Sequence, residues 1–350
     1  MRVGVGRALV ASCVAALTLG GVVACGGGSL APTATQTAHR AQVKQAPPEV
    51  PPTWPLSGEV GDVVERAAVS IKVDNERPAR PQTGLEQADL VWEEMIEGGE
   101  TRFIAVYNSM VPEVVGPVRS VRPMDGPILG AVRGILVASG GQDRFLREAT
   151  DAELQVLTED YKGFFRSGDR SMPHNLYVRP AEIWEQADPS HKALPLGEFH
   201  FAASPAAATA FAEGTDATQI DVVISAVAAP GWTFQPESRL YLRSERGNAS
   251  HSASGVRLSA ANVVILAVPV VNASGTDAAG SPIPDTKIVG SGRGLVAAGG
   301  KAIEVTWSKE SVAAPVALRT ADGSDVRLTV GQTWIELVPA DGGSWTVTAS

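Results

Sequence analysis

The segment "VGPVRSVRPMDG", residues 115–126, places Arg119 and Arg122 three residues apart between two prolines. A guanidinium group carries five donors in a planar fork and pairs best with a carboxylate or a phosphate. Proline disrupts a regular helix, and side chains three residues apart on an extended segment point to roughly opposite sides. We therefore predict a division of roles, in which Arg119 faces inward to a protein carboxylate and Arg122 faces outward to a ligand.

Three other segments carry residues of the same kind: "VDNERPARPQTG", "EEMIEGGETR" and "RSMPHNLY". A fourth feature is Gly140-Gly141, a turn from an apolar strand into a helix, where backbone N–H groups lie at the positive end of the helix dipole. Together these segments supply the candidate ligand-binding residues, which are Asn75, Arg77, Arg80, Glu94, Arg102, Arg119, Arg122, Gly140, Gly141, His174 and Asn175.

The residue types allow three roles: structural pairing, ligand binding, and catalysis by a histidine or by a pair of carboxylates. The arginines can form a structural network with Glu93, Glu94 or Glu97, or they can face a cleft and bind an anionic group together with Asn75 and the histidine. Proton transfer is the third possibility, because imidazole titrates nearest to neutral pH and His174 follows a proline in an extended segment. A pair of carboxylates could also act on a glycosidic bond, but no spacing in the sequence sets their separation. The catalytic residues stay unassigned.

Composition excludes several other functions. The net charge of −9 argues against a nucleic-acid binder, which needs a basic face. The five histidines do not fall at metal-ligand spacing, so we expect no metal and no cofactor.

The N-terminus predicts export. A short cationic start and an apolar run, residues 1–24, have the layout of a signal peptide. The run ends in "VVAC", which predicts lipidation at Cys25 by acyl chains such as palmitate, and residues 25–54 have the Pro- and Ala-rich composition of a disordered tether. Removal of the signal peptide would take away Cys13, so no thiol would remain for catalysis.

The remaining chain predicts an α+β protein in two parts. Residues 55–205 mix strands and helices, which we expect to form a layered α/β sandwich, whereas residues 218–350 contain short strands separated by turn residues, typical of a smaller β-rich domain. "AAVSIKVDN" predicts a half-buried strand and Gly98-Gly99 a hairpin. "RGILVASGG" predicts a buried strand, and helices are expected over "DRFLREATDAELQVL" and from Pro180.

These motifs resemble the YerB-like, or DUF3048, family of bacterial lipoproteins. The resemblance lies in "DNERPARPQTGLEQADLVWEE", "EGGETRF", "VGPVRSVRP", "PHNLY" and "GQTWIELVP", and so covers both parts of the chain. It implies an N-terminal α+β domain, a C-terminal β-rich domain and an anchor outside the cell, but no reaction.

From these observations we expect a lipid-anchored, extracytoplasmic protein of the cell membrane, more a binding or scaffolding module than an enzyme. Its partners would be the membrane and an anionic envelope ligand or a cell-wall protein, with no nucleic acid. The alternative is an envelope hydrolase that acts on a glycan or a peptide.

Overall fold

The structure of the protein is a computed structural model that describes residues 51–277 and 279–349. The described residues belong to one compact unit. The predicted signal peptide, Cys25 and most of the predicted tether lie outside the described residues.

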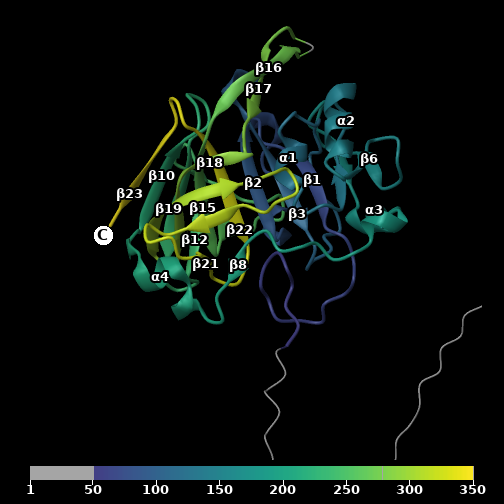
Figure 1. Ribbon diagram of the computed structural model, residues 1–350. Helices are drawn as coiled ribbons and strands as arrows, with labels where there is room; N and C mark the ends of the chain where they lie inside the picture. Colours follow the sequence, from purple (N-terminus) through teal and green to yellow (C-terminus); the bar gives the residue numbers. More distant parts are fainter. Residues whose placement is uncertain (1–50, 278, 350) are drawn as a thin grey trace, which may run out of the picture. The chain divides into compact units, whose positions relative to one another are not determined.

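An 11-stranded sheet runs through this unit (Figure 1). The strands in spatial order are β20 (Ala317–Arg319), β19 (Lys301–Lys309), β18 (Gly290–Ala298), β15 (Asn262–Val268), β22 (Thr333–Pro339), β2 (Leu90–Met95), β3 (Thr101–Tyr107), β1 (Val69–Asp74), β4 (Ile135–Val137) and β5 (Gln155–Leu157), with β9 (Thr215–Asp216) paired to β19. The first and second parts of the chain meet where β2 pairs in parallel with β22.

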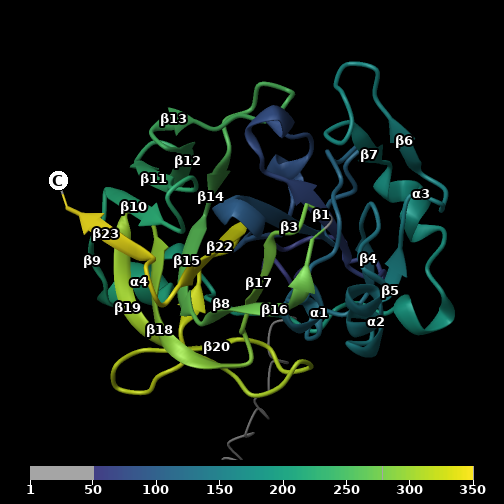
Figure 2. The ribbon, with the colours of Figure 1, turned by 90° about the horizontal axis from the view of Figure 1, so that it is seen from above.

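A second sheet of six strands packs on one face of the first (Figure 2). It consists of β13 (Asn248–Ala249), β12 (Leu240–Glu245), β11 (Pro230–Gln235), β10 (Gln219–Val223) and β23 (Ser344–Thr348), with β14 (Ser259–Ala260) beside β12. Aromatic side chains fill the space between the sheets, and the rings of Trp232 and Trp334 lie 5.3 Å apart, edge to face.

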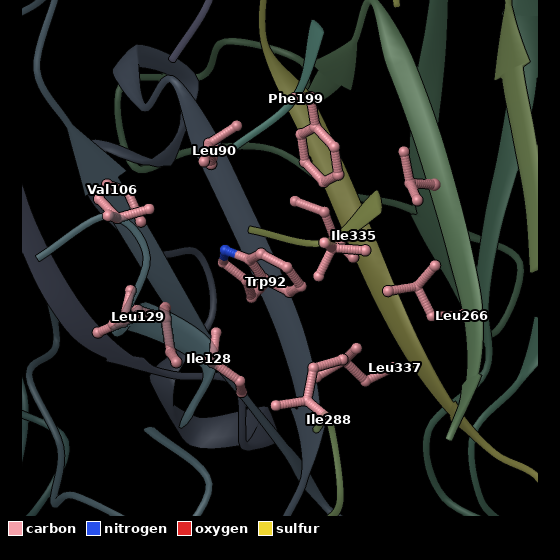
Figure 3. Packing of buried hydrophobic residues seen from close by; sticks show 14 of the residues in the cluster. Leu90, Trp92, Val106, Ile128, Leu129, Phe199, Leu266, Ile288, Ile335 and Leu337 are labelled. Atoms are coloured by element: carbon pink, nitrogen blue, oxygen red, sulfur yellow. The ribbon is translucent and has the colours of Figure 1, made fainter. Parts of the chain in front are cut away.

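Short helices cover part of the other face. Trp92 of β2 lies in this core among Ile128 and Leu129 of helix α1 (Asp125–Leu129) and Ile335 of β22 (Figure 3). Helix α2 (Asp143–Asp151) adds Phe145. Since this core joins residues from both parts of the chain, burial of apolar surface stabilises them together.

The remaining elements are short. They are α3 (Pro180–Trp184), α4 (Thr209–Glu213), β6 (Phe164–Arg166), β7 (Leu176–Val178), β8 (His200–Phe201), β21 (Arg327–Leu328), the hairpin of β16 (Val270–Thr276) and β17 (Pro282–Thr286), and the single-turn helices η1 (Arg77–Ala79), η2 (Leu85–Gln87), η3 (Glu97–Gly99), η4 (Pro189–His191) and η5 (Pro205–Ala207).

Several local predictions are confirmed: the β2–β3 hairpin, the buried strand β4, and a helix that begins at Pro180. Two are wrong in part. Strand β1 is buried on both faces, because the side opposite its apolar residues also lies inside the fold. The helix from Asp143 ends at Asp151, and the following "QVL" forms β5, where it pairs with β4.

The predicted α+β class is confirmed in its coarse form, because the described residues form several sheets with a few short helices. The layered N-terminal sandwich and the boundaries at 55–205 and 218–350 stay predictions. Strands β15, β18, β19, β20 and β22 of the second part belong to the same sheet as β1–β5, so the two parts share a sheet and a core.

Candidate ligand-binding site

Charged side chains gather at one end of the central sheet, where β1 and β2 end and β3 begins. In the strand register Arg102 pairs with both Asp74 and Glu94, and Glu93 pairs with Glu336 of β22. Successive side chains of a strand point to opposite faces. The end of the sheet therefore carries two charged groups, one on the face of α1 and one on the face of the six-stranded sheet.

The group on the α1 face is centred on a buried ion triad. Lys72 hydrogen-bonds to Glu94 and lies 2.7 Å from Asp125 Oδ1, and all three side chains are inaccessible to solvent. Burial lowers the pKa of Lys72 to about 8, although Asp125 opposes the change. The amine is therefore still charged at neutral pH, and Glu94, a predicted ligand-binding residue, is held by a structural partner.

Arg119 and Arg122 both pair with carboxylates. Arg119 lies 3.1 Å from Asp74 and 3.1 Å from Glu76, and Arg122 lies 2.7 Å from Glu97. Their side chains are 17% and 13% exposed, so the predicted inward–outward division is wrong. The reason is a turn: the Arg122 N–H donates to Asp125, which starts helix α1 and bends the segment back onto the sheet.

His174 is held by the same carboxylate as Arg119. Its Nδ1 lies 2.8 Å from Oδ2 of the fully buried Asp74. Asp74, Glu76 and His174 bring three potential metal-ligand atoms within 4.8 Å of one another. The guanidinium of Arg119 already bridges the two carboxylates, however, and supplies the positive charge that a cation would bring.

Arg102 is the least well paired of these cations. It donates to the Ser120 carbonyl at 3.2 Å, and its nearest salt-bridge carboxylate among the described residues, Glu76, is 3.9 Å away. Burial, followed by the charges of Arg122 and Arg119, lowers its pKa to about 9. A buried cation with few partners destabilises the fold, so this end of the sheet is electrostatically strained.

The other predicted residues of this region lie apart from Arg102. Asn175 is buried and bonds to Arg166 at 3.0 Å. Gly140 and Gly141 turn the chain from β4 into α2, as the sequence predicts, and Gly141 lines a hollow of about 280 Å³ beside Arg122. Glu97 and Asp277 also line that hollow, so negative charge there opposes an anion.

A larger cleft, of about 800 Å³, lies between the two parts of the chain and on the other side of the sheet end. One wall is the loop after β1, and the other is the β12–β13 hairpin with the residues that follow it. Hydrogen bonds from Ala253 to the Gln82 carbonyl (2.7 Å) and from Ser254 to Glu86 (2.9 Å) hold the two walls together. The cleft is lined by Asn75, Arg77, Arg80, Pro81, Gln82, Glu100, Val227, Arg243, Glu245, Arg246, Asn248, Ala249, Ser250 and His251. We call this the interdomain cleft.

Positive charge predominates in the interdomain cleft. Four arginines line it, against two glutamates. Arg80 donates to the Asn75 carbonyl at 2.6 Å and lies 3.9 Å from Glu245. Burial, followed by the charge of Glu76, raises the pKa of the Glu100 carboxyl. The positive charge of Arg80 opposes this increase.

Behind the cleft lies a second buried charge group. Arg243 contacts Glu93 at 2.7 Å and Glu245 at 3.0 Å. Burial alone lowers the pKa of Arg243, but Glu93, Glu245 and Glu336 together raise it. Asn75 also donates to Glu93, at 3.1 Å, so a residue of the first part and one of the second hold the same carboxylate.

Glu336 completes this group as a third buried carboxyl. It is fully buried, accepts from Trp232 Nε1 at 3.0 Å, and stands beside Glu93 in the strand register. Burial raises its pKa well above the usual range, and the negative charge of Glu93 adds to the effect.

The structure thus brings Asn75, Arg77 and Arg80 into one cleft, and it places the other predicted residues in buried ion pairs or elsewhere. Glu100 and all residues of the second wall are absent from the residues that the sequence predicted. The alternation of residues in "LYLRSE" was the signal that could have indicated this wall. Tyr241, Arg243 and Glu245 fall on one face of the strand, and that face is buried. Charged residues that alternate along a strand on the same face as a buried aromatic residue indicate a buried polar site.

The chain belongs to the family described as Protein of unknown function (DUF3048). Its N-terminal domain model matches residues 56–193, and its C-terminal domain model matches residues 220–335. The interdomain cleft takes its walls from both matched regions.

Comparison with known proteins agrees with this assignment. The chain is 28% identical over 287 residues to a Bacillus subtilis (strain 168) protein named "Putative lipoprotein YerB", covering 79% of this chain and 82% of that protein. The crystal structure of the YerB protein from Bacillus subtilis superposes with a TM-score of 0.71 at 26% identity, over 84% of this chain and 99% of the other. Among the described residues, no helix has the length and apolar character needed to cross a membrane.

Proposed function

We propose that this protein is an extracytoplasmic lipoprotein whose folded part binds an anionic ligand of the cell envelope in the interdomain cleft. The name of the Bacillus subtilis relative and the sequence around Cys25 support the lipoprotein role. The single observation that supports binding is the lining of the cleft, in which four arginines face two glutamates within a volume of about 800 Å³. Ligand sites commonly have volumes of roughly 300–1,000 Å³.

Arg77 is the side chain best placed to reach an anion. It is exposed, lines the cleft and makes no ion pair or side-chain hydrogen bond among the described residues. Arg243, in contrast, is held by Glu93 and Glu245. An incoming anion would therefore gain a bidentate partner at Arg77 without breaking an existing pair.

The test is calorimetric titration of the full-length, detergent-solubilised chain with two probes: poly(glycerol phosphate) and the acidic pentapeptide N-acetyl-Ala-Glu-Lys-Ala-Ala. Arg77→Gln should weaken binding of the active probe about tenfold, the equivalent of one charge-assisted hydrogen bond of roughly 1.5 kcal/mol. Arg147→Gln is the matched control, because Arg147 is exposed on α2 and lies outside the cleft. If neither probe binds, or if both variants lose affinity equally, the proposal fails.

One contact favours the hydrolase alternative. A buried carboxylate that fixes one nitrogen of a histidine leaves the other nitrogen available as a base, and Asp74 holds His174 Nδ1 in this way. The experiment is incubation with purified peptidoglycan sacculi, with released fragments measured by mass spectrometry. If the protein is a hydrolase, the wild type should release fragments and the His174→Asn variant should not. Equal release by the wild type and the variant would exclude this role for the histidine.

A further inference from the structure

Two side chains of opposite charge stand unengaged in the interdomain cleft. Glu100 is partly buried, and among the described residues its carboxylate accepts no hydrogen bond and makes no ion pair. Arg77 likewise has no side-chain partner among the described residues. The second glutamate of the lining differs, because Glu245 contacts Arg243 and accepts the Ala229 N–H, each at 3.0 Å.

A carboxylate in a binding site repels an anion unless the ligand brings a donor to it. The negative charges of Glu76, Glu245 and Asp74 also act on the Glu100 carboxyl, and the positive charge of Arg80 opposes them. Burial and these charges raise the pKa of this carboxyl. An ammonium group would relieve that repulsion, since it carries a positive charge and three donors.

The lining also excludes other ligand classes. It contains no Phe, Tyr or Trp side chain for stacking a base or a sugar ring, its one aromatic ring is the imidazole of His251, and its apolar members are Pro81, Val227 and Ala249. Such a surface does not fit an acyl chain or a planar cofactor, which need a mostly apolar pocket. The ligand must therefore be polar over most of its surface.

One side of the same cleft is formed by a short strand at the end of a sheet. Asn248 and Ala249 line it and form β13, the last strand in the order of the six-stranded sheet. An edge strand presents backbone N–H and C=O groups on its outer side, which an extended peptide can pair with. A phosphodiester polymer has no N–H groups to offer such an edge.

On this basis, and resting on the proposed function, we infer that the ligand is an acidic peptide with a free amine. Its carboxylates bind the arginines, chiefly Arg77, and its ammonium group binds Glu100. The cleft thus recognises a molecule with both charges, and Glu100 sets the specificity for the amine.

The experiment compares N-acetyl-Ala-Glu-Lys-Ala-Ala with the same peptide acetylated at the lysine Nε. Both are titrated calorimetrically into the full-length chain and into its Glu100→Gln and Glu304→Gln variants. Glu304 is a suitable control, because it is exposed on β19 and lies outside the cleft. We expect acetylation to weaken binding about tenfold in the wild type and in Glu304→Gln. It should have no effect in Glu100→Gln, because the lysine amine contributes to binding only through its contact with the Glu100 carboxylate.

Each other outcome has a defined meaning. Equal affinity of the wild type for both peptides, or an undiminished preference in Glu100→Gln, overturns the inference. Binding of poly(glycerol phosphate) but of neither peptide overturns the inference and leaves the proposed function standing. If none of the three probes binds, the proposed function fails and the inference fails with it. Melting temperatures of the variants verify that each is folded.

Discussion

The buried carboxyl of Glu336, behind the interdomain cleft, predicts that the stability of this protein depends on pH in a specific way. In the folded chain Glu336 is fully buried beside Glu93, and Arg243 contacts Glu93 but not Glu336. The pKa of the Glu336 carboxyl is therefore raised well above 4.5, its value in a solvated chain. At a pH between 4.5 and the raised pKa, the Glu336 carboxyl would therefore keep a proton in the folded state that it loses in the unfolded state.

The sign follows from proton linkage. Because the folded state binds more protons, the contribution of Glu336 to the free energy of unfolding falls as the pH rises. The decrease is about 1.4 kcal/mol per pH unit, and it ends when the pH passes the folded pKa of Glu336. This stabilisation is complete below the unfolded pKa and is lost on the alkaline side. Glu336→Gln removes the titration while keeping an oxygen to accept from Trp232. Relative to the wild type, the variant should therefore become more stable as the pH rises from 5.5 to 7.5, with about 1.4 kcal/mol per pH unit as the upper limit.

The assay is urea unfolding of the full-length chain in detergent, followed by tryptophan fluorescence, at both pH values. Glu304→Gln is the control, since this carboxylate is exposed on β19. Contributions from groups that do not interact with Glu336 cancel in the difference between wild type and variant, so the difference reports Glu336 together with its neighbour Glu93. If Glu336→Gln and the wild type show the same change in stability with pH, then Glu336 is ionised in the fold and the reasoning is wrong.

Three further outcomes are expected. Arg119→Lys and Arg122→Lys should each lower the free energy of unfolding by ~1–3 kcal/mol, measured by urea unfolding, because both lose a guanidinium–carboxylate contact; a stable Arg122→Lys would restore the outward role that the sequence suggested. Limited proteolysis within residues 201–218 should give fragments that co-elute on size exclusion under native conditions, because β2 pairs with β22; separate elution would show two independent domains. Cys25→Ala should move the protein from the membrane fraction to the soluble fraction on immunoblots, and full retention at the membrane would place the anchor elsewhere.

Local features of the fold could be predicted because they depend on neighbouring residues. The β2–β3 hairpin follows from two glycines between alternating segments, and both glycines adopt positive φ. The start of α3 follows from Pro180 at a first-turn position. The end of α2 could not be predicted in the same way, since "QVL" has apolar residues compatible with either structure and pairing with β4 decides for a strand.

For the candidate site, the sequence by itself determined the kinds of groups and part of their positions. The loop after β1 carries Asn75, Arg77 and Arg80 close together in the chain, so their shared wall of the cleft is a local property. The tertiary structure decided the rest. It placed Arg243 and Glu245 opposite that wall, and it engaged Arg122 with Glu97 instead of solvent.

The physical reason is that charge pairing acts through space, whereas motifs act along the chain. Whether an arginine binds a ligand or a protein carboxylate depends on which carboxylate the fold brings within about 4 Å of it. Glu93 and Glu336 are far apart in the sequence and become neighbours only when β2 and β22 pair. The pairing of these two strands therefore creates both the shared core and the buried pair of carboxyl groups behind the cleft.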